Sequence, residues 1–308
     1  MQTHRVFGLT LASDFPFAHR LDAGRGAPDL IFSLGTAPVL EGDGSRIYSS
    51  PWRDETGESI SHLDRFPDME VLRFPATADF YLEPGRITAH LLDPARRDLM
   101  ELRLLGPVLS YWLERLGILA LHASAVRIGA GAAGFVAHSG GGKSSLTATL
   151  VRAGASLLTD DILPVEEAGG TFLARPGYPQ MRMEPDSALH FLGKVDGLAA
   201  VCPDDSKLHV PVGSFGAFCD AAVPLVALYV VERRPGPLEI LPLSRSQAVI
   251  ELVRHSFSPY LVEAAGLQSR RLDLFSRLVR QVPVRRLSCP VGLEHLPQVA
   301  EILLSSAM

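Results

Sequence analysis

Residues 1–95 contain short apolar runs that are separated by clusters of glycine, proline and aspartate. Runs of this length without a helical period are typical of β-strands, so we predict a β-rich N-terminal domain over these residues. The turn Glu83-Pro84-Gly85 predicts a hairpin between the last two runs. The polar stretch from Glu41 to Asp64 is long for a compact domain, and we expect a disordered segment or a surface excursion there, with a loop that covers a site as the alternative. The predicted strands are Val6–Leu11, Leu30–Leu34, Val71–Phe74, Phe80–Leu82 and Ile87–Leu92.

Apolar residues recur at helical spacing over residues 94–116, with charged residues between them. Pro107 lies inside this pattern, so we expect the helix to kink or split there. We assign residues 96–308 to a second domain of α/β character, in which the polar segment 202–211 is predicted to be mobile. Its later helical patterns are Ser246–His255, Leu267–Val282 and Glu294–Leu304. Its predicted strands after residue 161 are Leu163–Glu166, Thr171–Ala174, a central strand Leu225–Val231, its neighbour Leu238–Leu243, and Val284–Leu287.

Two apolar runs between Ile118 and Ser139 flank a Gly129-Ala130-Gly131 turn, which predicts a β-hairpin. With the turn centred on Ala130, His122 lies opposite His138, at the edge of the glycine-rich segment that follows. His122 is therefore a candidate functional residue, and a histidine whose polar atoms are satisfied in the core is an equal alternative.

The stretch from Ala137 to Ser144 matches the phosphate-loop pattern G-x-x-x-x-G-K-[ST], except that alanine stands in the first position. An apolar run precedes the stretch and a helical pattern follows it, as such a loop requires. Glycines let successive backbone N–H groups face phosphate oxygens, and the helix directs its positive end at the same anion. Lys143 suits the β- and γ-phosphates, and Ser144 offers a hydroxyl to Mg²⁺. The predicted nucleotide-binding residues are Ser139, Gly140, Gly141, Gly142, Lys143, Ser144 and Ser145.

Asp160 and Asp161 follow this loop closely in the sequence. The helix that begins at Lys143 stops near Gly154, and the apolar run Ser156–Thr159 returns as a strand parallel to the one before the loop. A right-handed crossover brings the end of that strand, with both aspartates, back to the loop. One carboxylate suits Mg²⁺ and the other can accept the proton of an attacking hydroxyl. A role in capping or turning the backbone is the alternative for this pair.

Composition narrows the classes of function. The formal net charge of -5 gives no indication of non-specific binding to nucleic acid or to an anionic membrane. No apolar run approaches the ~20 residues of a membrane span, and no signal-like segment begins the chain, so we expect a cytoplasmic location. Cys202, Cys219 and Cys289 are far apart and form no Cys-x-x-Cys pair, which indicates neither a zinc site nor a disulfide framework.

Segment 119–165 resembles the HPr kinase/phosphorylase family, and more closely its monofunctional, HprK-like members such as precursor-peptide kinases. The shared features are a histidine ahead of the loop, a Ser-Gly-x-Gly-Lys-Ser loop, a short helix that ends in glycine, and an Asp-Asp pair close behind. Most other phosphate-loop ATPases carry their second acidic motif much farther along the chain. A weaker likeness extends to segments 176–187 and 207–211.

The resemblance implies a P-loop kinase core of the type shared by HPr kinases and phosphoenolpyruvate carboxykinases, with ATP and Mg²⁺ as cofactors. By position, it implies that Lys143 and Ser144 hold phosphate and metal. It makes Asp160 the general base, supported by His122, and Asp161 the second acidic residue near the metal. The Glu-Ile-Arg-Gly segment of the bifunctional members is missing. HPr as the acceptor, phosphorylase activity and a homo-oligomer like that of the family therefore stay open.

Arg182 and Lys207 are candidates for contacts with the acceptor or the transferred phosphate, and solvated surface charges are the alternative. The sequence thus predicts an ATP- and Mg²⁺-dependent kinase for a serine hydroxyl of a peptide or protein, with a ribosomally made precursor peptide as one acceptor class. A kinase for a small hydroxylated molecule and a nucleotide-binding regulator are the alternatives. A regulator would not need the acidic pair.

Overall fold

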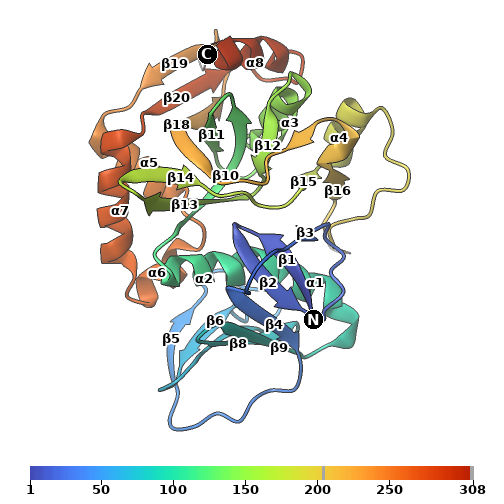
Figure 1. Ribbon diagram of the computed structural model, residues 1–308, viewed down its shortest axis with the longest axis vertical. Helices are drawn as coiled ribbons and strands as arrows, with labels where there is room; N and C mark the ends of the chain where they lie inside the picture. Colours follow the sequence, from blue (N-terminus) through green and yellow to red (C-terminus); the bar gives the residue numbers. More distant parts are fainter. Residues whose placement is uncertain (203–204, 306–308) are drawn as a thin grey trace. The chain divides into compact units, whose positions relative to one another are not determined.

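The computed structural model describes residues 1–202 and 205–305. These residues form two compact units (Figure 1). Unit 1 contains Met1–Arg115 and Ser258–Gln268, and unit 2 contains residues 116–202, 205–257 and 269–305. In the described ranges, no helix is both long enough and apolar enough to cross a membrane.

Unit 1 is built around a nine-stranded sheet in the order β3-β1-β2-β4-β9-β8-β7-β6-β5. Its core is apolar, and β8 is buried along almost its whole length between β7 and β9. The strands are β1 (Gln2–Val6), β2 (Leu9–Ser13), β3 (Asp22–Ala23), β4 (Leu30–Leu34), β5 (Ser45–Ser49), β6 (His62–Arg65), β7 (Glu70–Phe74), β8 (Ala78–Glu83) and β9 (Arg86–Leu91).

Two predictions for this sheet were wrong. The run Val6–Leu11 is not one strand, because Phe7 and Gly8 take φ values of 53° and 72° and turn the chain between β1 and β2. Positive φ at both central residues is what a two-residue hairpin turn of type I′ requires. The polar stretch predicted as disordered or as a surface excursion contains β5, which pairs with β6 and is tied to it by Arg46.

The helical segment that follows the sheet is split, as predicted, around Pro107. A short helical turn, η1 (Pro94–Arg96), leads into α1 (Arg97–Arg103), and α2 (Leu109–Arg115) follows a wide turn at Leu104–Val108. Proline cannot donate to the preceding turn of the helix, which explains why the break falls here.

Buried polar contacts hold these helices within unit 1. Glu101 of α1 accepts a hydrogen bond from the backbone N–H of His19 at 2.8 Å, and Tyr111 of α2 donates to Glu70 at 2.8 Å. The compact unit therefore runs through α2, whereas the sequence places a division after residue 95. It also includes a short helix that periodicity did not predict, α6 (Pro259–Ala264).

Unit 2 is an α/β unit around a second nine-stranded sheet. Its strands are β10 (Leu119–Ile128), β11 (Gly131–Val136), β12 (Ser156–Thr159), β13 (Ile162–Ala168), β14 (Thr171–Ala174), β17 (Ala217–Phe218), β18 (Val223–Arg233), β19 (Glu239–Pro242) and β20 (Val284–Cys289), beside a separate pair, β15 (Gln180–Met183) and β16 (Leu208–Pro211). Its helices are α3 (Lys143–Arg152), α4 (Pro185–Leu192), α5 (Arg245–Arg254), α7 (Gln268–Gln281), which begins at the last residue of unit 1, and α8 (Leu296–Ser305), with a short turn η3 (Val212–Ser214).

Strand β10 organises this sheet because it pairs along its first half with β13 and along its second half with β11 and β12. Both β11 and β12 are antiparallel to β10 and so run parallel to each other on either side of it. This confirms the predicted parallel return of the strand after the phosphate-loop helix. The pairs β10–β13, β13–β14, β14–β18, β18–β11 and β11–β10 close a ring of strands.

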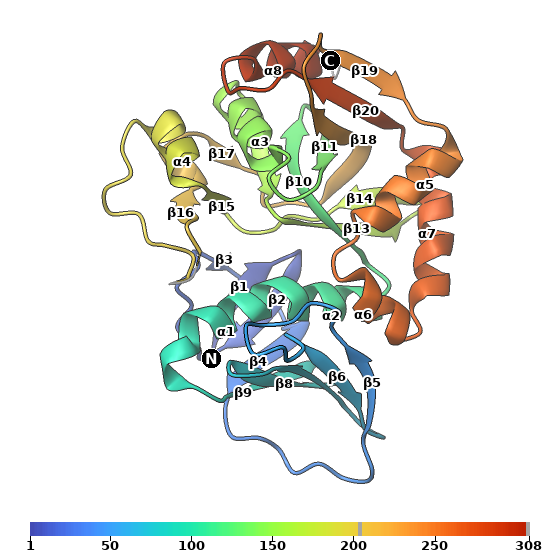
Figure 2. The same cartoon turned by 180° about the vertical axis from the view of Figure 1, so that it is seen from behind.

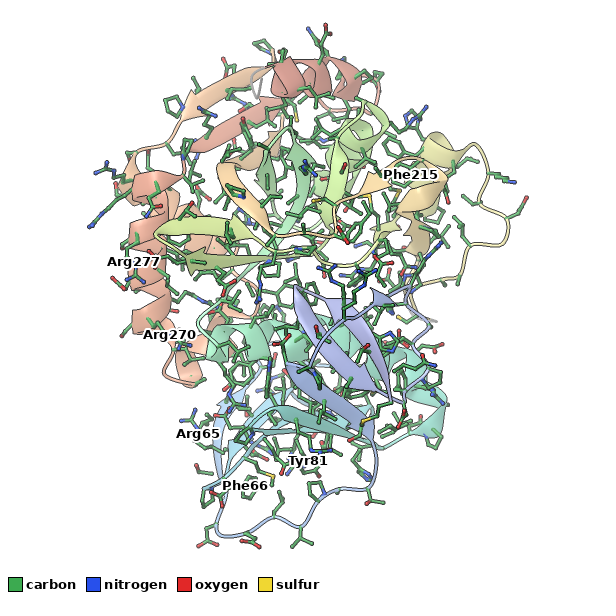
Figure 3. All side chains as sticks on the ribbon, viewed as in Figure 1. Arg65, Phe66, Tyr81, Phe215, Arg270 and Arg277 are labelled. Atoms are coloured by element: carbon green, nitrogen blue, oxygen red, sulfur yellow. The ribbon has the colours of Figure 1, made fainter. Side chains whose placement is uncertain are left out.

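Helices cover both faces of the sheet (Figures 1 and 2). One apolar core contains residues of α3, α4 and α8, and the other contains residues of α5 and α7. Phe135 of β11 lies in the first core and its neighbour Val136 lies in the second, which explains why β11 reads as a continuous apolar run. Arg277 of α7, which is labelled in Figure 3, is paired with Glu167 of β13 at 3.0 Å.

Three predictions for unit 2 need correction. The predicted strand Leu238–Leu243 pairs, as β19, with β20 instead of with the central strand β18. The β10–β11 register opposes Ala123 to Val136, so His122 does not lie opposite His138 but pairs with Ile162 of β13. In the segment predicted to be mobile, β16 pairs with β15, while residues 203–204 lie outside the described residues. Each error concerns strand pairing, which depends on partners distant in sequence.

Candidate active site

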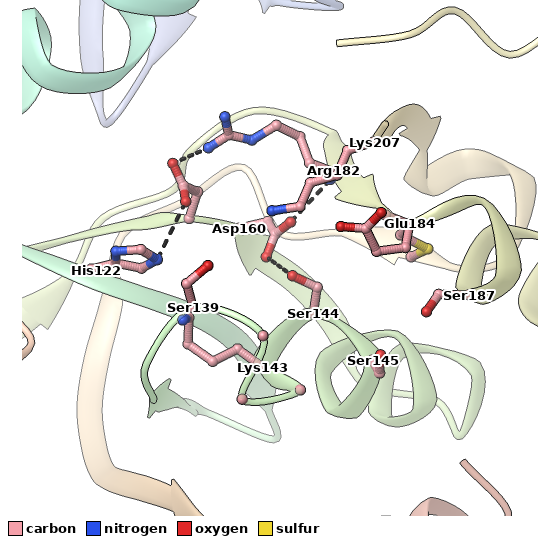
Figure 4. Close-up of a pocket in the computed structure, with 15 residues that line it drawn as sticks. His122, Ser139, Lys143, Ser144, Ser145, Asp160, Arg182, Glu184, Ser187 and Lys207 are labelled. Carbon is pink, nitrogen blue, oxygen red and sulfur yellow. Dashed lines mark hydrogen bonds and ion pairs between the residues drawn. The ribbon is translucent and has the colours of Figure 1, made fainter. Parts of the chain in front are cut away.

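A cavity of about 290 Å³ in unit 2 collects side chains from five separate segments of the chain (Figure 4). Every site residue predicted from the sequence lines it: His122, the loop residues 139–145, Asp160, Asp161, Arg182 and Lys207. The sequence did not predict three further lining residues, which are Met183, Glu184 and Ser187.

The phosphate loop depends on glycine for two different reasons. Gly140 and Gly142 have φ values of 75° and 84°, which side chains rarely adopt. Gly141 has an ordinary φ, but a Cβ there would lie 2.7 Å from the Cβ of Ala137 and 2.9 Å from the carbonyl of His138. Ala137 is not among the residues with positive φ, so alanine fits the position where the pattern has its first glycine.

Helix α3 begins at Lys143 directly after this loop. Its N-cap, Gly142, has no side chain to occupy the first N–H groups of the helix, which leaves them available to an anion. The Lys143 ammonium lies over the loop and donates to the carbonyl of Ala137 at 2.8 Å. Burial lowers the pKa of Lys143, although Asp161 and Asp160 act in the opposite direction.

Asp160 is buried and both oxygens of its carboxylate accept hydrogen bonds. One oxygen accepts hydrogen bonds from Ser144 at 3.0 Å and from Ser124 at 2.6 Å, and the other accepts from the backbone N–H of Arg182 at 3.0 Å. Sequence reasoning missed Ser124, although it stands two residues after His122 and therefore faces the same side of strand β10.

Asp161 has different neighbours from Asp160. Its carboxylate forms an ion pair with Arg182 and lies 3.6 Å from Nε2 of His122. Burial opposes ionisation of this carboxyl, but the neighbouring positive charges, with Arg182 first among them, outweigh burial, and the pKa of Asp161 is lowered. His122 thus pairs with Asp161, whereas the family resemblance implied support for Asp160.

The backbone explains this placement. Asp161 takes a φ of 73°, a left-handed conformation that aspartate adopts more readily than most residues. Its carbonyl accepts a hydrogen bond from the N–H of Ala123 at 3.1 Å, next to His122 in β10. The turn between β12 and β13 therefore directs two adjacent carboxylates to two different sets of partners.

His122 is half-buried beside the cavity, and burial lowers its pKa against the opposing effect of Asp161. The imidazole is therefore neutral near pH 7, where it can orient a carboxylate or share a proton with it. A second histidine, His255, does not line the cavity, but its ring lies 5.0 Å from that of His138 in the loop, tilted by 55°. Burial, followed by the charges of His138 and Lys143, lowers the pKa of His255 to about 4.

The opposite wall of the cavity comes from β15, the start of α4 and the segment before β16. Burial disfavours the charged form of Arg182, but Asp161 outweighs burial, so the pKa of Arg182 is raised. Lys207 extends into the cavity (Figure 4) and forms no ion pair within the described ranges. Glu184 accepts a hydrogen bond from Ser206 at 2.7 Å.

The donor set fits a hard cation. Asp160 and Ser144 present oxygen atoms 3.0 Å apart beside the phosphate loop, and Mg²⁺ prefers oxygen ligands shared with nucleotide phosphates. These two residues are the ones that could hold the metal. Asp161 is less suited, because Arg182 already neutralises its charge.

No family model matches the chain, and no curated protein matches it. Among solved structures, it is similar to the HPr(Ser) kinase/phosphatase from Coxiella burnetii, with 13% sequence identity and a TM-score of 0.32. That similarity covers 61% of this chain and 94% of the other. The functional conclusion therefore depends on the geometry of the cavity.

Proposed function

We propose that this chain is an ATP- and Mg²⁺-dependent kinase that phosphorylates a serine hydroxyl of a peptide or protein. The observation that carries the proposal is the presence, in one cavity, of a phosphate loop and two carboxylates with separate partners. Binding of a nucleotide needs only the loop. Transfer to a hydroxyl also needs a group that positions the nucleophile and accepts its proton.

On the donor side, the backbone of residues 139–142 and the start of α3 bind the polyphosphate. The Lys143 ammonium, which donates to the carbonyl of Ala137 in this structure, then donates to a phosphate oxygen instead. Asp160 and Ser144 would hold Mg²⁺, which would neutralise charge on the phosphates. Ser124 keeps the Asp160 carboxylate oriented through its 2.6 Å hydrogen bond.

On the acceptor side, the serine oxygen forms a bond to the γ-phosphorus while the bond from that phosphorus to the leaving oxygen of ADP breaks. The serine proton passes to Asp161, which is ionised because its pKa is lowered. His122 orients Asp161, and Arg182 lies where it can stabilise negative charge on the transferred group. We therefore exchange the roles that the family resemblance implied for the two aspartates.

A peptide acceptor is supported by the resemblance of segment 119–165 to precursor-peptide kinases and by the cationic Arg182 and Lys207 on the acceptor wall. The direct test incubates the protein with ATP, Mg²⁺ and serine-containing peptides and measures intact mass. Each peptide is matched by a copy with alanine in place of serine, and Lys143→Ala serves as the inactive control.

A phosphoryl adduct on the serine peptide alone is the expected result. A phosphoryl adduct that forms only on small hydroxylated molecules would mean that the acceptor is a small molecule and not a peptide. ATP binding without any adduct would favour the nucleotide-dependent regulator and would overturn the proposed phosphotransfer.

A further inference from the structure

Arg233 is not among the residues that line the cavity, yet its side chain lies against Gly142 of the phosphate loop. It is the last residue of β18, which runs parallel to β11, the strand that leads into the loop. Because parallel strands end at the same edge of a sheet, the end of β18 and the phosphate loop come together there.

The contact is with the last glycine of the loop. A Cβ placed on Gly142 would lie 2.5 Å from Nε and 2.7 Å from Nη2 of Arg233, so the guanidinium packs directly on this glycine. The same guanidinium donates from Nη1 to the carbonyl of Gly292 at 3.1 Å. Gly292 follows β20, the parallel neighbour of β18 on its other side. Arg233 therefore connects the start of α3 to the turn after β20.

The charge of Arg233 is not neutralised locally. The two residues adjacent to it in the sequence form ion pairs with other residues: Glu232 with Arg286 at 3.0 Å, and Arg234 with Glu239 at 2.5 Å. Within residues 1–202 and 205–305, Arg233 forms no ion pair, and its buried Nε has no hydrogen-bond partner. The nearby thiol of Cys289 has a pKa raised by burial and stays neutral. A fixed positive charge is thus left beside the N-terminus of α3.

We infer that Arg233 is a positioning residue of the phosphate site, which braces the loop through Gly142 and adds positive charge behind it. The ligand that it serves is the polyphosphate of the nucleotide. This inference depends on the proposed function, since it presupposes that the loop binds a nucleotide. It also explains why Gly142 is glycine on two counts: its φ of 84° and the guanidinium packed against it.

The test measures the affinity of the full chain for ATP and for inorganic tripolyphosphate by titration calorimetry. Arg233→Ala is expected to weaken both ligands about tenfold, the size of effect expected when one nearby fixed charge is removed from an anion site. Arg233→Lys, which keeps the charge, should recover part of the loss. Arg234→Ala is the matched control and should leave both affinities unchanged, because its charge is paired with Glu239.

The outcomes separate the inference from the proposed function. A wild-type chain that binds neither ligand overturns both. A wild-type chain that binds ATP while Arg233→Ala binds it equally well overturns the inference alone. Loss of ATP affinity with unchanged tripolyphosphate affinity would also overturn it, because Arg233 would then act on the nucleoside. Arg233→Met, which keeps the side-chain stem, gives the same comparison should the alanine variant fail to fold.

A double-mutant cycle tests the contact itself. Gly142→Ala strains the backbone and collides with the guanidinium, and only the collision disappears when Arg233 is also replaced. Gly142→Ala should therefore reduce tripolyphosphate affinity less in the Arg233→Ala background than in the wild type. Additive effects of the two substitutions would contradict the proposed bracing.

Discussion

The two walls of the active-site cavity differ in how their chemistry is held in place. On the loop wall, residues 139–145 form one continuous segment that works mainly through backbone N–H groups and the start of α3. The β15 wall comprises residues 182–187 and Lys207. Its charged side chains belong to two segments that are separated in the sequence and are brought together by strand pairing. Geometry fixed by the backbone suits a constant group such as a polyphosphate, whereas side chains can be adapted to one particular acceptor.

The side chains of the two aspartates contact different walls of the cavity. Asp160 shares a hydrogen bond with Ser144 of the loop wall, and Asp161 is paired with the Arg182 guanidinium of the β15 wall. Substitutions on the loop wall should therefore affect the nucleotide, and substitutions on the β15 wall should affect the acceptor.

The largest effect is expected from Lys143→Ala on the loop wall. Removing the cation that neutralises the transferred phosphate should lower the rate of phosphotransfer by about a thousandfold or more. The measurement is the initial rate of peptide phosphorylation, with the exposed Lys194→Ala as the matched control. Activity of Lys143→Ala near the wild-type rate would mean that the loop is not the donor site.

Asp161→Asn tests the division between the aspartates. It should lower kcat by a factor on the order of 10²–10⁴, as expected for loss of a general base, with ATP affinity little changed. Asp160→Asn should instead raise the Mg²⁺ concentration required for activity. Measurement of kcat across a magnesium titration distinguishes the two. A normal magnesium requirement with abolished turnover in Asp160→Asn would return the role of base to Asp160.

The packing beneath the loop wall predicts a pH dependence of stability. His255 is buried with a pKa of about 4, whereas an unfolded histidine titrates near 6.5. The unfolded chain thus binds more protons between these values, so this contribution to stability is complete above pH 6.5 and is lost as the pH falls toward 4. The loss amounts to about 3 kcal/mol.

Denaturant unfolding of wild type and His255→Phe at several pH values measures this contribution. The variant should show a shallower decline in the free energy of unfolding between pH 6.5 and 4. Parallel declines in the two proteins would assign the acid sensitivity to other groups.

The smallest effects are expected on the β15 wall. Arg182→Met and Lys207→Met should each raise the KM for the acceptor peptide by about tenfold, with a smaller change in the KM for ATP. Arg182→Met should also lower kcat, because Arg182 stabilises charge on the transferred group. Loss of Arg182 should also raise the pKa of Asp161, so activity should begin to fall at a higher pH on acidification. Steady-state kinetics with each substrate varied across a pH series provide both readouts. A rise confined to the KM for ATP would assign this wall to the nucleotide.

Sequence reasoning was most successful where function depends on local backbone chemistry. The strand, glycine turn and helix around Lys143 lie where the pattern predicts them, because φ preferences and helix N-termini are properties of contiguous residues. The return of Asp160 and Asp161 to the loop followed from the handedness of one crossover.

The contacts between the site residues were decided by the tertiary structure alone, because they depend on pairing between strands that are distant in the sequence. The register of β10 with β11 and β13 placed His122 beside Asp161 instead of Asp160 and brought Ser124 to Asp160. The pairing of β15 with β16 brought Glu184 and Lys207 to the same wall. A shift of one residue in strand register turns every side chain to the other face, and no local pattern in this chain specifies that shift. The sequence therefore determined the phosphate loop and the aspartates beside it, and the fold decided which further residues join them and which of them are partners.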